Sequence, residues 1–213
     1  GYSSAASDVY KRQIQTGDME RIIRECKKRN IFVMIDETYV EFAPCIEEIT
    51  AIPLTKRYDN LMVIRGVSKF YAAPGLRFGY GITSSEAFLK SLHQHQNPWS
   101  LNSVGAYTGE LMLKDTDYFR ETRALILSER ERMFARLSHM GGYKPYAAYG
   151  NFILVRILKE GLTSFDVFEA AIKNRLMIRD CSSFESLTGE YIRFCIMNPE
   201  DNDRLLHVLN SLI

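Results

Sequence analysis

The sequence predicts an α/β fold followed by a smaller α+β domain, and three features indicate this fold class. Continuous apolar runs at residues 31–35, 61–64 and 78–82 are typical of strands covered on both faces, as in a mostly parallel sheet. An amphipathic helix precedes the first run, so helix and strand alternate. A long charged helix then leads into short strands and helices, which indicates a second domain.

The first helix is predicted from the apolar spacing that starts at Met19. Ile22, Ile23 and Cys26 follow it at the i, i+3, i+4, i+7 positions of one helix face, with Asp18 near the start. Residues 1–13 show neither a helical nor a strand period. We expect a disordered or non-native leader there.

The second half alternates helices and strands, and its last helix has a clear start signal. Asn198 is the expected cap, Pro199 takes the first position, and Glu200 and Asp201 fall in the first turn. The other expected elements are helices at 102–114, 117–140 and 164–174, and strands at 152–157, 176–178 and 191–196. We therefore divide the chain into a leader (1–13), part of a large domain (14–115) and a small domain (116–213).

Composition excludes few functions but narrows the setting. The formal net charge is +1, so no nucleic acid or anionic membrane is required as a partner. The apolar runs are too short to span a bilayer. The four cysteines show no CxxC spacing and no neighbouring histidine pattern, which fits reduced, mostly buried thiols of a cytoplasmic protein better than a metal site or disulfides.

Two segments carry groups suited to chemistry. Asp36 ends the first apolar run, where open α/β sheets bind ligands, although an acid there is equally typical of a helix cap. After the second run, Ser68, Lys69 and Arg77 share one glycine-containing stretch. A lysine can form a Schiff base with an aldehyde, and an arginine with a hydroxyl can bind a phosphate. On spacing alone, a solvated loop with incidental charges remains an open alternative.

Together these segments resemble the signature of the class I/II aminotransferases. Residues 36–39 match its DE-x-Y element, and residues 68–80 match its SK-x5-GLR-x-GY element. The resemblance continues from residue 14 to the C-terminus. It implies the fold type I of pyridoxal 5′-phosphate (PLP) enzymes, with residues 14–115 as the C-terminal part of the PLP-binding domain.

The resemblance also implies roles for five residues. Lys69 is expected to hold PLP as a Schiff base and to move the proton between the substrate Cα and the cofactor. Asp36 is expected to pair with the pyridine nitrogen, so that the ring acts as an electron sink. Tyr39 would donate a hydrogen bond to the phenolic oxygen of the ring. Ser68 and Arg77 would bind the cofactor phosphate.

Three further residues are expected on the substrate side. Arg193 matches the arginine that clamps the substrate α-carboxylate, a role suited to a planar guanidinium. Arg179 matches a second arginine found in relatives with phosphorylated substrates, and Asn151 matches a polar residue facing the substrate. Each could instead be an ordinary surface residue.

Within the family, the sequence is most similar to L-threonine-O-3-phosphate decarboxylase and histidinol-phosphate aminotransferase. The stretches that resemble the decarboxylase are 68–77, 97–102 and 178–184. Transamination and decarboxylation differ in which Cα bond stands perpendicular to the conjugated system, an angle that a sequence does not show. The expected substrate is an α-amino acid or a phosphorylated amino compound.

The chain also departs from the family pattern. Gly66 stands where relatives commonly carry a serine or threonine that helps to bind the phosphate. The family's upstream phosphate loop, stacking aromatic residue and asparagine do not precede residue 14, so we expect an N-terminal third to be missing. We therefore expect weak PLP binding and low activity from this chain alone, and a homodimer in the full-length parent.

Two other classes of function compete with an enzyme. One is a non-catalytic, aminotransferase-like module that senses a ligand for a regulator. No basic helix pair for DNA binding is present in these residues, but the expected missing N-terminal part leaves this alternative open. The other is an inactive α/β domain. The joint presence of Asp36, Tyr39, Lys69, Arg77 and Arg193 argues against an inactive domain, because such a domain has no need to keep all five residue types at these spacings.

Overall fold

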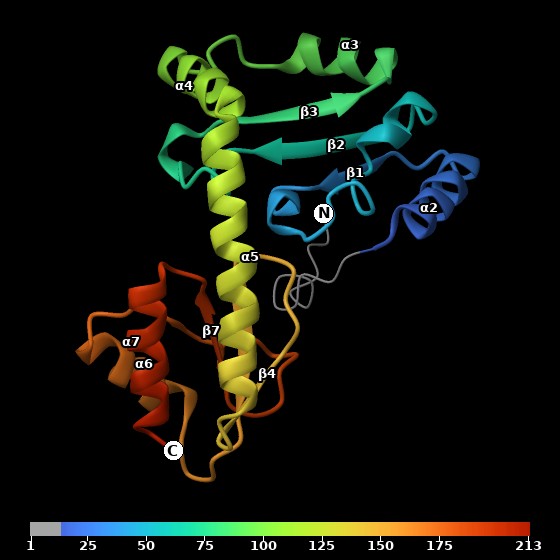
Figure 1. The fold of residues 1–213 in the computed structure, drawn as a ribbon. Coiled ribbons are helices and arrows are strands. Elements are labelled where there is room, and N and C mark those ends of the chain that lie inside the picture. Colours follow the sequence, from blue (N-terminus) through green and yellow to red (C-terminus); the bar gives the residue numbers. More distant parts are fainter. Residues whose placement is uncertain (1–13) are drawn as a thin grey trace. The chain divides into compact units, whose positions relative to one another are not determined.

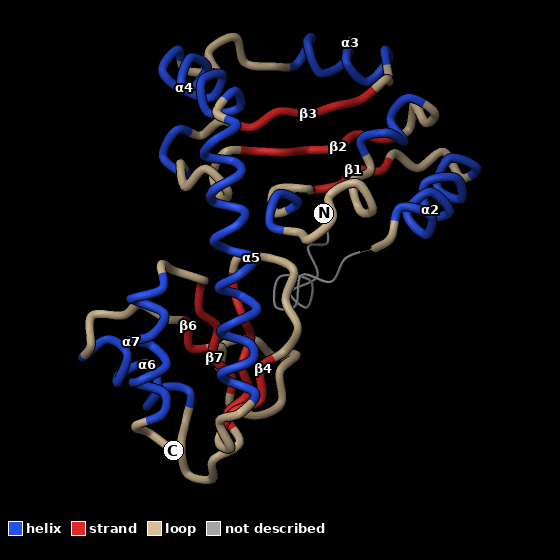
Figure 2. Tube along the Cα trace, viewed as in Figure 1, coloured by secondary structure: helices blue, strands red, loops and turns tan. Residues whose placement is uncertain are grey.

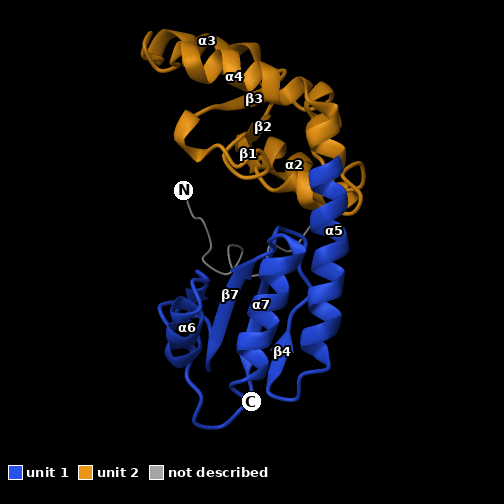
Figure 3. Ribbon diagram, turned by 60° about the vertical axis from the view of Figure 1, so that its left-hand side comes forward, with its two compact units in different colours: residues 1–12, 121–213 blue, residues 13–120 orange. Residues whose placement is uncertain are grey.

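The computed structural model describes residues 14–213, which form two compact units, 14–120 and 121–213 (Figures 1 and 3). The predicted leader lies outside the described residues. The two units meet in sequence within helix α5 (Thr116–Ser138), close to the predicted boundary at residues 115 and 116. The assignment of the units as large and small domains stays a prediction.

The unit 14–120 is a mixed α/β unit (Figure 2). Its elements before α5 are α2 (Thr16–Lys28), β1 (Val33–Asp36), η1 (Val40–Phe42), η2 (Ile52–Lys56), β2 (Leu61–Gly66), η3 (Pro74–Leu76), β3 (Gly79–Thr83), α3 (Glu86–His95) and α4 (Ser103–Lys114).

The sheet of this unit has the order β1-β2-β3. β1 and β2 run parallel, whereas β3 returns antiparallel to β2, so the sheet is mixed. Ile23 of α2 packs with Leu61 and Val63 of β2 and with Leu54 of η2, and all four side chains are fully buried. This cluster fixes α2 against the strands that carry the predicted cofactor residues.

β1 differs from its prediction as a strand covered on both faces. Phe32 is 37% exposed and Met34 is 55% exposed, and in the described residues β1 pairs only with β2. Phe88 of α3 stacks on Phe32 with ring centroids 4.5 Å apart, which gives partial cover. That prediction is wrong for β1 in this chain, because an apolar run shows that a strand suits burial but does not supply the element that buries it.

The unit 121–213 is an antiparallel sheet with helices on one face (Figure 3). The strand order is β4-β5-β7-β6. Besides the main part of α5, its elements are β4 (Tyr143–Pro145), β5 (Phe152–Ile157), α6 (Ser164–Lys173), β6 (Arg179–Asp180), β7 (Tyr191–Cys195) and α7 (Pro199–Asn210). The largest fully buried side chains of this unit are Met133, Leu137, Ile153, Leu154, Ile192, Leu205 and Leu209.

Most sequence predictions for this unit are confirmed, and one strand is not. β5 has the predicted bounds, and the Asn198 side chain accepts a hydrogen bond from the Asp201 amide at 2.8 Å, as expected of a cap. The strand predicted at 176–178 is wrong. Leu176 still closes the end of α6, with its amide donating to Ala171, so the strand starts only at Arg179.

Two negative findings apply to residues 14–213. In this range no helix combines the length and apolar character needed to cross a membrane, and no three histidine, cysteine or acidic side chains gather as a metal site. All four cysteines are free, but only Cys181 is buried, so the expectation of mostly buried thiols is wrong. Cys26 on α2 and Cys45 are half-buried, and Cys195 at the end of β7 is exposed.

The core of the unit 121–213 makes a stability prediction. Ile153→Ala removes a fully buried side chain and leaves a cavity, so we expect a loss of about 2–5 kcal/mol in the free energy of unfolding. Urea unfolding followed by circular dichroism measures it. Leu158→Ala is the control, because Leu158 is 51% exposed and should lose much less. Equal losses would contradict the assigned core.

Candidate functional site

The carboxyl end of β1 holds Asp36 and leads to Tyr39. Asp36 is the last residue of β1 and is exposed. Its Oδ1 accepts a hydrogen bond from the Thr38 amide at 2.9 Å, which turns the chain sharply toward η1. Among residues 14–213, Oδ2 of Asp36 has no hydrogen-bond partner. One carboxylate oxygen thus orients the side chain while the other is available to a ligand.

The carboxyl end of β2 leads to Lys69 within three residues. Lys69 is exposed, and its Nζ lies 5.8 Å from the centroid of the Tyr39 ring. Within the described chain it forms no ion pair or hydrogen bond through Nζ. The structure therefore brings the predicted Schiff-base lysine and the predicted ring-contacting tyrosine together.

The loop from residue 67 to residue 78 has an unusual backbone. Ala72 and Arg77 have φ angles of 49° and 52°, in the left-handed region that side chains disfavour. The loop closes through hydrogen bonds from the Ala72 amide to Lys69 (3.1 Å) and from the Ala73 amide to Val67 (3.3 Å). Backbone strain of this kind collects at functional sites, where surrounding structure holds it in place.

Arg77 lies at the same edge of the sheet as Ser68. Its neighbour Phe78 accepts a hydrogen bond from the Val67 amide at 3.3 Å, so the two ends of the loop are paired. The Arg77 guanidinium is exposed and donates to the carbonyl of Pro74 at 3.1 Å. Both predicted phosphate-binding residues thus belong to one closed loop, together with Lys69.

Gly66 permits a close approach of β2 and β3. A Cβ at this position would lie 3.3 Å from the carbonyl oxygen of Phe78 and 3.7 Å from Gly79 Cα. A side chain here would require the facing backbone to move by a few tenths of an ångström. The glycine that departs from the family pattern therefore lies where β2 and β3 pack closely.

Two anchors of the loop were not predicted. Asn102, the N-cap of α4, donates from Nδ2 to the carbonyl of Leu76 at 3.2 Å, immediately before Arg77. Tyr118 donates its hydroxyl to the carbonyl of Phe70 at 3.1 Å, immediately after Lys69. Asn102 belongs to a stretch already noted for its resemblance to the decarboxylase, but only the fold reveals its contact.

Phe70 holds the loop in the hydrophobic core. Its ring is 2% exposed and lies 5.3 Å from the Phe42 ring and 5.2 Å from the Phe119 ring, measured between centroids. The exposed Lys69 is therefore followed directly by a fixed aromatic side chain. This arrangement limits the backbone freedom of the lysine while its amine stays open to solvent.

In the unit 121–213, two arginines stand directly opposite each other. Arg179 of β6 pairs in register with Arg193 of β7, so both side chains leave the same face of the sheet. Their guanidinium carbons lie over aromatic rings, Arg193 at 4.7 Å from Phe152 and Arg179 at 4.8 Å from Phe184. Like charges in this position repel each other, and a bound anion would offset that repulsion.

Asn151 is half-buried at the start of β5. Its carbonyl accepts a hydrogen bond from the Ile196 amide at 2.7 Å. The preceding carbonyl, of Gly150, accepts from the buried Arg130 guanidinium at 2.8 Å. The backbone that carries the third predicted substrate residue is therefore fixed from α5 and from the end of β7.

The eight predicted site residues divide between the two units. The five expected at the cofactor belong to residues 14–120, and Lys69 and Tyr39 are the two for which the structure records a direct contact. The three expected at the substrate belong to residues 121–213, and there Arg179 and Arg193 are neighbours.

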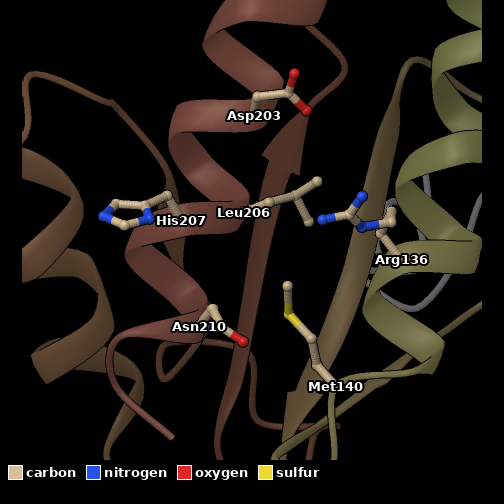
Figure 4. Close-up of a pocket in the computed structure, with 6 residues that line it drawn as sticks. All are labelled: Arg136, Met140, Asp203, Leu206, His207 and Asn210. Atoms are coloured by element: carbon tan, nitrogen blue, oxygen red, sulfur yellow. The ribbon is translucent and has the colours of Figure 1, made fainter.

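A separate hollow of about 370 Å³ lies on the helical side of the unit 121–213, between α5 and α7 (Figure 4). It is lined by Arg136, Met140, Asp203, Leu206, His207 and Asn210. The sequence singles out none of these residues, and no buried polar group points into the hollow to define a ligand. It therefore carries no functional assignment.

Comparison with known proteins identifies the family. The model of the family described as "Aminotransferase class I and II" matches residues 14–209 of this chain. The chain belongs to the class I and II aminotransferase family.

Individual relatives and solved structures within this family are also similar to the chain. The chain is 31% identical to a threonine-phosphate decarboxylase of Salmonella typhimurium over 92% of its own length and 52% of the relative. The histidinol-phosphate aminotransferase structure from Clostridium acetobutylicum matches with a TM-score of 0.82 and 29% identity, covering 90% of this chain and 57% of the other.

A further solved structure shares the fold. The histidinol-phosphate aminotransferase of Sinorhizobium meliloti, in complex with pyridoxal-5′-phosphate, matches with a TM-score of 0.74 and 21% identity, over 91% of this chain and 53% of that one. The predicted fold type I class is thus confirmed. The chain spans about half the length of the curated relatives it matches.

The buried thiol of Cys181, close to the arginine pair, leads to a prediction about pH dependence. Burial raises the pKa of Cys181 from 9.0 to about 11, against the opposing influence of Arg193 and Arg179. The folded state therefore gains stability from the neutral thiol below pH 9 and loses it as the pH rises through 11. At pH 8 we expect iodoacetamide to modify Cys181 at least about tenfold more slowly than the exposed Cys195.

Peptide mass spectrometry measures both rates in the same sample, and Cys181→Ser and Cys195→Ser assign the peptides. The Cys181 rate should rise steeply as the pH is raised. Equal rates at pH 8 would show that Cys181 is neither buried nor shifted as described.

Proposed function

We propose that this chain binds PLP through a Schiff base on Lys69 and acts on an α-amino acid or a phosphorylated amino compound. The single observation that carries the proposal is the position of the Lys69 amine, 5.8 Å from the Tyr39 ring and free of ion pairs in the described residues. Family membership and the neighbour solved with PLP indicate the same cofactor.

The donor set fits PLP group by group. An amine (Lys69) matches the aldehyde, and a carboxylate (Asp36) matches the pyridine nitrogen. A phenol (Tyr39) matches the phenolic oxygen of the ring, while a hydroxyl (Ser68) and a guanidinium (Arg77) match the phosphate. The left-handed loop and the close approach at Gly66 give this set a defined backbone.

When bound, PLP supplies an electron sink for the pair released at the substrate Cα. In the proposal Asp36 keeps the pyridine nitrogen protonated, with its Oδ1 already held by the Thr38 amide. Lys69 would hold the aldehyde carbon of the cofactor through its Nζ and would move a proton at the substrate Cα. Ser68 and Arg77 hold the phosphate, and Tyr39 donates to the phenolic oxygen.

On the substrate side, Arg193 binds the α-carboxylate in the proposal, and Arg179 binds a second anionic group such as a phosphate. Their opposed register supports this, because two guanidiniums on one face suit a substrate that carries two anions. Asn151 supplies a polar contact from its fixed backbone. The relatives named as a threonine-phosphate decarboxylase and a histidinol-phosphate aminotransferase have phosphorylated compounds in their names.

Both transamination and decarboxylation fit these residues, and product analysis distinguishes them. Assembly of the full protein into a homodimer and a cytoplasmic location belong to the proposal through the family resemblance. The non-catalytic sensing module would bind the same ligands without forming product.

The first test concerns the lysine. We expect the chain with added PLP to develop a visible absorption band that borohydride removes. Lys69→Ala should abolish the band, because the variant lacks the amine that is proposed to form the Schiff base. Lys90→Ala is the matched control, since Lys90 is also exposed and lies on α3.

Trypsin digestion after reduction should place the PLP adduct on the Lys69 peptide. A band that survives Lys69→Ala or that Lys90→Ala weakens equally would refute the assignment of the lysine.

The second test concerns the arginine pair. We expect Arg193→Lys to weaken the binding of O-phospho-L-threonine by about 10- to 100-fold, because a lysine loses the bidentate geometry toward a carboxylate. Calorimetric titration of the PLP-treated chain measures the affinity. Arg156→Lys is the control, since Arg156 also stacks on a ring, at 5.9 Å from Tyr191, but its register partners are Lys144 and Tyr191 and not a second arginine. Equal weakening in both variants would contradict the pair as the anion site.

A further inference from the structure

A buried ion pair links the two strands that carry the proposed cofactor residues. Arg65 of β2 donates from Nη2 at 2.8 Å and from Nε at 3.1 Å to the same carboxylate oxygen, Oε2 of Glu37. The side chains are 16% and 6% exposed, respectively. The exposed ion pairs of the unit 14–120 are far more solvated, so this pair stands apart in its environment.

The remaining acceptor capacity of Glu37 is also used. Its Oε2 accepts from the Thr50 hydroxyl at 2.9 Å, and its Oε1 accepts from the Ala51 amide at 2.5 Å. Arg65 donates to the same Thr50 hydroxyl at 3.0 Å. The network therefore joins the end of β1, the end of β2 and the segment that enters η2.

The pair lies next to the candidate site in the sequence on both strands. Glu37 directly follows Asp36, and its amide donates to Ile64 at 2.9 Å, which extends the parallel ladder by one residue. Arg65 precedes Lys69 by four residues. Each partner is thus tied covalently to one half of the cofactor donor set.

A buried carboxylate is costly unless it is paired and hydrogen-bonded. Any shift of β1 along β2 would separate Glu37 from Arg65 and leave both charges uncompensated in a site with little water. The guanidinium also offers its donors in a fixed plane, so the contact is directional as well as attractive. The pair therefore resists sliding of one strand end past the other.

The charges around the pair support this. Glu41 is buried nearby, and burial raises its pKa, with Arg65 opposing the shift and Glu37 adding to it. Arg65 thus acts electrostatically on two buried carboxyl groups, Glu37 and Glu41.

We propose that the Glu37–Arg65 pair is a positioning clasp that fixes Asp36 and Tyr39 relative to Ser68 and Lys69. The inference rests on the proposed function, since the residues whose separation the clasp fixes are those expected to contact different parts of one cofactor. Glu37 and Arg65 are positioning residues and need not touch the ligand. The network is complete without any bound group.

The chain offers a matched control for this clasp. Arg57 donates two hydrogen bonds to Glu20, at 2.8 Å and 3.1 Å, in the same unit. That pair joins α2 to the end of η2 and is more exposed, at 58% and 28%. Glu20→Gln therefore removes an arginine–glutamate ion pair of similar distances that is not tied to the ends of β1 and β2.

The first measurement uses amide hydrogen exchange on the chain without PLP. The reporters are the amides of Thr38, which donates to Asp36, and Ala72, which donates to Lys69. We expect Glu37→Gln and Arg65→Lys each to speed exchange at both reporters by at least about tenfold. Glu20→Gln should leave both unchanged. Unchanged exchange at Thr38 and Ala72 in the clasp variants would overturn the inference.

The second measurement is the rate at which PLP, trapped with borohydride, labels Lys69. The rate is taken as a ratio to that of Lys90 in the same molecule, which corrects for general unfolding. We expect the ratio to fall at least about tenfold in Glu37→Gln and in Arg65→Lys, and to hold in Glu20→Gln. Arg65→Lys keeps the charge but loses the fork, so full retention of the ratio in that variant would contradict a directional clasp.

A double variant, Glu37→Gln with Arg65→Met, covers the case in which a single change unfolds the unit, because it removes both charges of the pair together. It should still lower the ratio. If the unmodified chain labels Lys69 no faster than Lys90, the proposed function fails, and the exchange measurement alone decides the clasp. If labelling is selective but insensitive to the clasp variants, the function stands and the clasp is refuted.

Discussion

The parallel pairing of β1 with β2 is the constraint on which the arrangement of the proposed cofactor residues depends. Parallel strands bring their carboxyl ends to the same edge of a sheet, so Asp36, opposite Ile64, and Lys69, beyond Gly66, leave the sheet together. The pairing continues one residue past β1 through the Glu37 amide. Without this register, the acid and the amine would belong to unrelated parts of the surface.

The loop after β2 holds the backbone at Lys69 while the Lys69 side chain stays exposed. Lys69 is exposed, but Phe70 beside it is anchored among aromatic rings, and Tyr118 binds its carbonyl. The left-handed conformations of Ala72 and Arg77 are retained because the loop is closed at both ends. The backbone at Lys69 is therefore held by the neighbouring residues and not by contacts of the lysine side chain.

The sheet of the unit 121–213 has two different faces, one packed against helices and one that carries two arginines. The helices cover one face (Figure 3). Arg179 and Arg193 share the face opposite to that of the buried Ile192 and Phe194, and each lies over an aromatic ring. Strand alternation requires this division, since residues that pair in register share a face. A core that stabilises the sheet and the proposed anion-binding arginine pair can then coexist on the same short strands.

The sequence by itself determined the fold class, most elements and the residue types of the site. An apolar run predicted β5 and a cap signal predicted α7, because burial and capping act over a few neighbouring residues. It also drew attention to Asp36 and Lys69 through their spacing. It missed the open face of β1 and the late start of β6. Apolar residues indicate that burial is favourable, but they do not show which element buries them. Only the tertiary structure decided that Glu37 meets Arg65, that Asn102 holds Leu76 and that Arg179 stands opposite Arg193. These contacts join residues 14 to 28 positions apart, and their geometry depends on register and loop closure, which no local pattern encodes.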